Sequence, residues 1–125
     1  LVMGRRMSLV LLLAILAAAT FIFRSRMQNW MTIVNASGQV IPEISVQVSG
    51  YRYTFQNIQP DHTARSQFVV QGDDQFRVRG KLADGKDITA DAGYITNSMF
   101  GERVKLTVRP DGSVEHVQGQ DVESY

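Results

Sequence analysis

Cysteine is absent from this sequence, and histidine is scarce, with His62 and His116 the only two in 125 residues. Without cysteine the chain forms no disulfide, no thiolate metal site and no acylated-cysteine anchor. The two histidines are 54 positions apart, so they match none of the short spacings that hold a metal ion. We therefore expect a fold stabilised by apolar burial alone, without a metal or another cofactor.

Sequence motifs of catalysis are missing as well. No G-x-S-x-G surrounds a serine nucleophile, and the acidic turns at 72–74 and 84–87 lack the full pattern of a calcium loop. Nucleic-acid binding needs a concentrated basic surface. Four of the thirteen basic residues lie in the first 26 residues, and the other nine are outnumbered by twelve acidic residues. We therefore expect neither enzymatic activity nor a nucleic-acid partner.

The dominant feature is an uncharged apolar run over residues 7–23, MSLVLLLAILAAATFIF. As a helix this run covers about 25 Å at about 1.5 Å per residue, close to the lower limit of roughly 17 residues for crossing a bilayer. The sequence predicts an N-terminal transmembrane signal anchor over 1–26, whose span at 7–23 lies in the lipid bilayer, and an interfacial linker over 27–31. Guanidinium groups and a tryptophan ring suit the membrane interface, and the residues expected there are Arg5, Arg6, Arg24, Arg26 and Trp30.

Two other interpretations of the apolar run stay open: a signal peptide cleaved near Ala17–Ala19, and a buried core helix of a soluble protein. The run continues past these alanines to Phe23, which favours a retained anchor over a cleaved signal. Two arginines flank each side, so the charge rule decides the orientation only by a thin margin. The short basic N-terminal segment resembles that of an export signal. We therefore expect the N-terminus inside and the domain on the periplasmic or outer side of the cytoplasmic membrane.

Beyond residue 31 the hydrophobic pattern changes to the alternation typical of β-strands. Apolar residues recur at every second position, as at 44–48, 76–80 and 104–108, and turns rich in Gly, Pro and Asp separate these segments. Pro42 is expected to interrupt the chain, and 68–70 is expected to form a strand.

The strand pattern predicts an all-β domain over 32–117 and a polar tail over 118–125. About seven short segments separated by turns favour an antiparallel sandwich or a small open barrel. The apolar positions of these segments face inward in either architecture, and the expected core includes Phe55, Phe68, Phe76, Val78, Leu106 and Val108.

Several short motifs of this region resemble a known family. They are Asn35-x-Ser37-Gly38, Tyr53-x-Phe55-x-Asn57-Ile58-x-Pro60, Leu82-x-Asp84-Gly85 and Gly93-Tyr94-Ile95. Together they are similar to those of uncharacterised small bacterial proteins with one membrane segment before an all-β domain. The tyrosine motif also resembles prealbumin-like and collagen-adhesin B-type sandwiches, although Asp61 replaces the glycine that usually follows the proline. The resemblance implies a fold and brings no catalytic residues.

Basic residues alternate with apolar residues in two of the expected strands. Alternate positions of a strand share one face, and these positions hold Arg77, Arg79, Lys81, Arg103, Lys105 and, after Thr107, Arg109. If the two strands are neighbours, their basic side chains form one patch for anionic headgroups or an acidic partner protein. Alternatively, the charges keep an outer sheet face soluble and protect an edge from pairing.

We therefore expect a membrane-anchored accessory subunit or assembly factor of a larger bacterial membrane complex, which binds a membrane-protein partner through its β-domain. A domain without a convergent polar site is suited to binding rather than to catalysis. Two alternatives stay open. One is a small ligand-binding or hydrolytic envelope domain that uses His62 or His116 with a carboxylate, and the other is a structural cell-envelope protein that docks by an edge strand.

Overall fold

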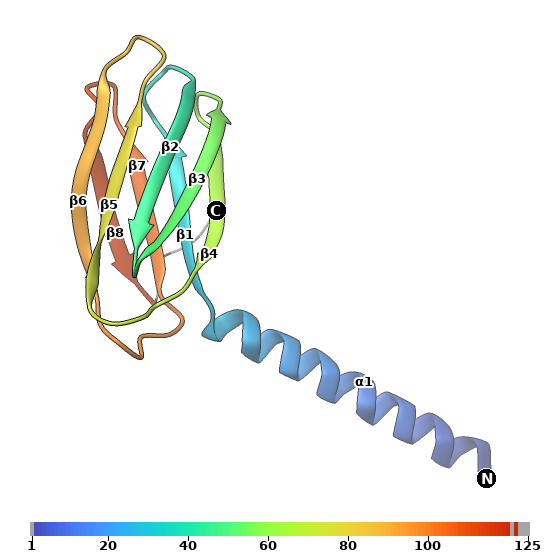
Figure 1. The fold of residues 1–125 in the computed structure, drawn as a ribbon. Coiled ribbons are helices and arrows are strands. Elements are labelled where there is room, and N and C mark those ends of the chain that lie inside the picture. The colour runs from blue at the N-terminus through green and yellow to red at the C-terminus, as the bar shows by residue number, and fades with distance from the viewer. Residues whose placement is uncertain (1, 121, 123–125) are drawn as a thin grey trace.

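A computed structural model describes residues 2–120 and 122, and it contains one N-terminal helix followed by eight strands (Figure 1). Of residues 2, 3, 25 and 26 only the backbone is described. The helix α1 spans Val2–Met27. The strands are β1 Asn29–Asn35, β2 Ile41–Val48, β3 Tyr51–Ile58, β4 Thr63–Phe68, β5 Asp74–Lys81, β6 Asp87–Ile95, β7 Arg103–Val108 and β8 Val114–Gly119.

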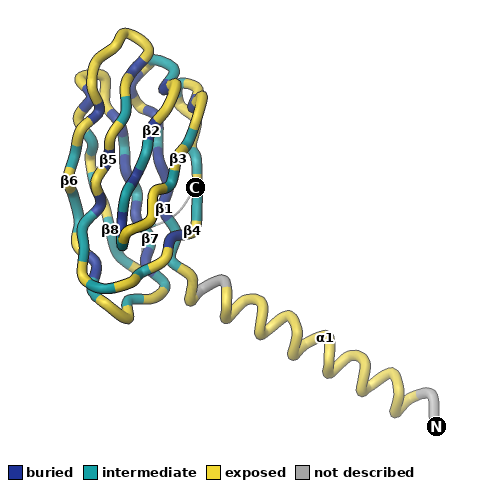
Figure 2. Tube along the Cα trace, in the orientation of Figure 1, coloured by how far each residue is buried: buried dark blue, intermediate teal, exposed yellow. Residues whose placement is uncertain are grey.

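Helix α1 is apolar over Gly4–Arg24, a segment of 21 residues with a mean hydropathy of 2.3. Leucine and alanine favour the helix, and none of this segment is buried by the rest of the chain (Figure 2). By length and composition α1 can cross a membrane, which makes it a candidate single-pass anchor or signal sequence. Arg5 and Arg6 lie near the start of the segment and Arg24 at its end, whereas the side chain of Arg26 lies outside the described part of the chain.

The eight strands form two four-stranded sheets that pack as a sandwich (Figure 1). The first sheet has the order β4-β1-β7-β8, and the second sheet has the order β3-β2-β5-β6. This arrangement confirms the prediction of an all-β sandwich, although it has eight strands where about seven were expected. Neighbouring strands are antiparallel except for β1 and β7, which pair in parallel. Parallel neighbours need a long connection, and between β1 and β7 the chain passes through the second sheet twice.

Two expected strand limits are wrong. The strand expected at 68–70 is instead β4, which lies before that segment and ends at Phe68. Its inward positions before Phe68 hold the small residues Ala64 and Ser66, so β4 lacks the apolar alternation that marks the other strands.

Pro42 does not interrupt the chain but lies inside β2. The pairing of β2 with β5 starts only at Glu43, so the missing amide hydrogen of Pro42 breaks no bond of that ladder.

The connections at both ends of the domain are shorter than the sequence pattern predicts. Of the expected linker over 27–31, only Gln28 lies between α1 and β1. At the other end, Gln118 and Gly119 of the expected tail belong to β8, while residues 121 and 123–125 lie outside the described part of the chain. The first sheet therefore begins almost directly where the helix ends.

The apolar core fills the space between the two sheets. Phe76 of β5 is fully buried and contacts Phe68 of β4 edge to face, with ring centroids 5.3 Å apart. Five of the six expected core residues are buried, whereas Phe55 is only partly buried because it lies on the edge strand β3. The buried apolar residues are Met31, Ile33, Ile41, Ile44, Val46, Val48, Ile58, Phe68, Phe76, Val78, Leu82, Ile88, Ile95, Val104, Leu106 and Val108.

The buried side chain of Asn35 closes the end of the sandwich away from α1, which we call the distal end. Its amide nitrogen donates to the carbonyl oxygens of Gln39 at 2.7 Å and Ile58 at 2.9 Å. Its amide oxygen accepts a hydrogen bond from the hydroxyl of Ser37 at 2.6 Å. The Asn35-x-Ser37 motif therefore ties the turn after β1 to the end of β3, which is a structural role.

Candidate interaction surfaces

Polar contacts on both sides of Gln28 tie helix α1 to the sandwich. The backbone N–H of Gly101 donates to the carbonyl oxygen of Met27 at 2.9 Å. The side chain of Gln67 donates to that of Gln28 at 2.6 Å, and Arg103 donates to the Gln28 carbonyl oxygen at 2.5 Å. These contacts hold the end of the helix against β4 and against the loop before β7.

The outer face of the first sheet gathers basic side chains around the single tryptophan of the sequence. Strand register places Trp30 of β1 beside Arg103 of β7, and it places Thr32 between Arg65 of β4 and Lys105 of β7. Alternation points these side chains away from the core. We call Trp30, Arg65, Arg103 and Lys105 the basic–aromatic face.

The side chains at the α1 end of this face are in close contact. The guanidinium carbon of Arg65 lies 4.6 Å from the centroid of the Trp30 ring, which is a cation–π contact. Partial burial lowers the pKa of Arg103, and the positive charge of Arg65 adds to the lowering. Arginine stays charged at neutral pH despite such a shift. Thr32 is also buried, and its hydroxyl has no hydrogen-bond partner among the described residues.

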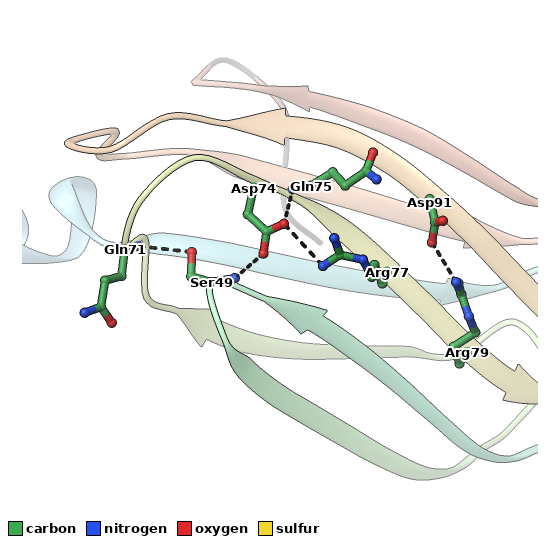
Figure 3. Close-up of polar contacts among 7 residues, drawn as sticks. All are labelled: Ser49, Gln71, Asp74, Gln75, Arg77, Arg79 and Asp91. Atoms are coloured by element: carbon green, nitrogen blue, oxygen red, sulfur yellow. Dashed lines mark hydrogen bonds and ion pairs between the residues drawn. The ribbon is translucent and has the colours of Figure 1, made fainter.

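On the outer face of the second sheet, the basic side chains of β5 pair with acidic side chains. Figure 3 shows the carboxylate of Asp74 accepting hydrogen bonds from the backbone N–H groups of Gln75 and Ser49. These bonds, with the charge of Arg77, lower the pKa of Asp74. The ion pairs of this face are Arg77–Asp74 at 3.3 Å, Arg79–Asp91 at 2.9 Å and Lys81–Asp87 at 3.9 Å.

The two expected basic stripes lie on opposite sides of the sandwich. The basic residues of β5 belong to the second sheet and those of β7 to the first, so the two strands are not neighbours and the condition for one continuous patch is not met. Arg109 follows β7 at the distal end, where it pairs with Glu115 at 2.7 Å. The sequence pattern also missed that Trp30 and Arg65 join the β7 stripe. Their proximity depends on which strands flank β1, and apolar alternation carries no information about strand order.

The two histidines lie at opposite edges of the first sheet. His62 is exposed in the turn before β4, and His116 is on β8. The His116 ring points toward the core, with its centroid 6.3 Å from that of Phe76, and its Nε2 is 2.9 Å from Oε1 of Gln118. Within residues 2–120 and 122, no group of three or more His, Asp and Glu side chains is placed to hold a metal ion. The fold therefore does not bring the histidines together in one site.

Comparison with known proteins adds information on the fold alone. The sequence matches no protein-family model, and no curated protein is significantly similar to it. A similar solved structure is the NMR structure of a protein from Eubacterium rectale, with a TM-score of 0.57 and 11% sequence identity. The match covers 78% of this chain and 95% of that chain. At this identity the similarity supports the sandwich architecture and says nothing about activity.

Proposed function

We propose that this protein is a membrane-anchored accessory subunit or assembly factor of a larger membrane complex. In this proposal α1 is a retained single-pass anchor in the cytoplasmic membrane, with the N-terminus inside and the sandwich on the outer side. The sandwich binds an acidic segment of a partner protein through the basic–aromatic face.

The observation that carries this proposal is the composition of the outer face of the first sheet. The outward positions of its four strands hold Arg65, Arg103 and Lys105 around Trp30, with the Arg65 guanidinium over the tryptophan ring. Tryptophan and arginine are the residue types most enriched at the energetic centres of protein interfaces. A basic face favours an acidic partner through steering and specificity.

The rest of the described surface supports binding rather than catalysis. A catalytic site needs a nucleophile or acid–base group close to groups that position it. The two histidines lie at opposite edges of one sheet, and three acidic side chains of the second sheet, Asp74, Asp87 and Asp91, form ion pairs with basic residues of β5. The β-domain therefore has a docking role in the proposed function.

Charge reversal on one face at a time tests the docking role. We expect that Arg65→Glu with Lys105→Glu removes the partner when the full chain is purified in mild detergent. The matched control is Arg79→Glu with Lys81→Glu on the second sheet, which should keep the partner. Arg79 and Lys81 are exposed, and exposed charges contribute little to stability, so the control should unfold near the wild-type temperature. A thermal melt of Arg65→Glu with Lys105→Glu verifies that this variant is folded, so that a lost partner is not a lost fold. Retention of the partner by the first variant, or its loss from the control alone, would contradict the proposal.

Membrane extraction tests the anchor separately. The native chain should stay in the membrane pellet in alkaline carbonate. Leu12→Arg with Ala18→Arg should release it, because a charge at the centre of a span costs about 2.5 to 3.5 kcal/mol on an insertion scale. A mature N-terminus near Thr20, or a native chain that carbonate extracts, would show that α1 is not a retained anchor.

A further inference from the structure

The end of the sandwich next to α1, the proximal end, exposes apolar side chains that the distal end does not. Five large apolar residues of the β-domain are exposed among those described, and all except Val117 lie at or beside the proximal end. These four are between 46% and 56% exposed: Tyr51 at the start of β3, Val69 after β4, Tyr94 near the end of β6 and Phe100 in the loop before β7. The strand ends that carry them meet at the base of the sandwich in Figure 1.

The loop that carries Phe100 is fixed at the level of the helix end. Gly101 donates its backbone hydrogen bond to Met27, the last residue of α1. The uncharged run ends at Phe23, four residues earlier, and four residues of helix rise about 6 Å. The headgroup layer of one leaflet is roughly 5 to 7 Å thick. If Phe23 marks the edge of the hydrocarbon, Phe100 is therefore at the height of the headgroups.

We propose that the proximal end of the sandwich docks on the bilayer that α1 crosses, with Phe100 and Val69 in the headgroup layer. This inference rests on the proposed role of α1 as a retained anchor. Tyr51 and Tyr94 suit the rim of such a contact, because tyrosine places an apolar ring and a wet hydroxyl at a membrane interface. Val69 and Met99, the residue before Phe100, line one groove with Gln28, which directly follows α1, so this part of the proximal end is beside the end of the helix.

Docking of the proximal end gives the domain a fixed orientation. The basic–aromatic face starts at Trp30, two residues after Gln28, and runs up the side of the sandwich from the same end. A docked proximal end therefore keeps the Trp30 end of this face close to the membrane surface. That is the height at which a segment flanking the span of a neighbouring membrane protein leaves the bilayer.

Single-cysteine labelling of the full chain tests the docking, because the native sequence has no cysteine. Phe100→Cys and Val69→Cys are labelled with a nitroxide in phosphatidylcholine nanodiscs, and collision with oxygen is compared with collision with a water-soluble nickel chelate. Ala83→Cys, in the exposed turn between β5 and β6 at the distal end, is the aqueous control. Leu12→Cys in α1 is the membrane control. Circular dichroism melts verify that each labelled variant keeps its fold.

The expected oxygen-to-nickel ratio at Phe100 and Val69 is several-fold above that at Ala83, and below that at Leu12. Ratios at both proximal positions equal to that at Ala83, with a high ratio at Leu12, would overturn the docking and leave the anchor intact. A ratio at Leu12 as low as that at Ala83 would overturn the anchor and the docking together. The two failures are therefore distinguishable in one data set.

Discussion

The outer faces of the two sheets each carry arginine and lysine at alternate positions of a central strand, β5 in the second sheet and β7 in the first. In the second sheet, each basic residue of β5 has an acidic partner within 4 Å. In the first sheet, β7 pairs with β1, which brings Trp30 and the cation of Arg65 beside the β7 stripe. The same alternation therefore places the basic side chains of β5 beside carboxylates and those of β7 beside an aromatic ring and a further arginine. Which contacts the basic side chains of a strand make is therefore decided by the strands beside it.

The largest expected effect comes from the core that separates the two faces. Phe76→Ala should lower the free energy of unfolding by about 3 to 5 kcal/mol, because it empties a fully buried site that contacts Phe68 of the other sheet. Arg77→Ala, one position away on the outer face, should change it by no more than about 0.5 kcal/mol. Urea titration of the full chain in detergent, followed by Trp30 fluorescence, measures both. Equal losses would mean that β5 does not separate an inner from an outer face.

A smaller effect of opposite sign is expected on the outer face of the first sheet. Thr32→Val removes a buried hydroxyl without a described partner, so it should raise the stability by about 1 kcal/mol. Thr54→Val is the matched change on the outer face of the second sheet, where the threonine is exposed, and it should stay within about 0.5 kcal/mol. The same urea titration reports both values. A loss of stability in Thr32→Val would show that the Thr32 hydroxyl makes a stabilising hydrogen bond. The expected difference between Thr32 and Thr54 would then be contradicted.

The smallest expected effect is a change in how the stability of the protein depends on pH, caused by Asp74 of the second sheet. Hydrogen bonds from Gln75 and Ser49, together with Arg77, hold the pKa of Asp74 below its ordinary value of 3.8. A carboxyl with a lowered pKa contributes its full stability above the ordinary value and loses it as the pH falls through the lowered one. Asp74→Asn should therefore be less stable than wild type at pH 7, and this difference should shrink below pH 3.8. Thermal melts across the pH range check it, and a difference that grows in acid would contradict the assignment.

The fold was largely predictable because the inward positions of most strands are large and apolar. Val78, Leu106 and Val108 follow this rule and are buried as expected. Strand β4 was missed because Ala64 occupies one of its inward positions, and the burial of β4 comes from pairing with β1 rather than from its own composition. Local periodicity predicts which side of a strand faces the core.

The candidate site was only partly predictable, for a related physical reason. Arg103 and Lys105 were selected from their alternation, but Arg65 reaches Trp30 only because β4 and β7 flank β1 on either side. Such contacts join residues far apart in sequence, and their formation depends on the order of strands in the sheet. No local pattern at Arg65 distinguishes it from an ordinary solvated arginine.

Photo-crosslinking from the two outer faces tests the docking role most directly, because it leaves the charges of both faces in place. A photoreactive phenylalanine analogue is placed at Val117, which is exposed beside Lys105 on the first sheet, or at Thr54, which is exposed on the second. The cells are irradiated before the membranes are solubilised. The proposed function predicts a covalent adduct with a membrane protein from position 117 and none from position 54. An adduct from position 54 alone, or no adduct from either position, would contradict docking through the basic–aromatic face.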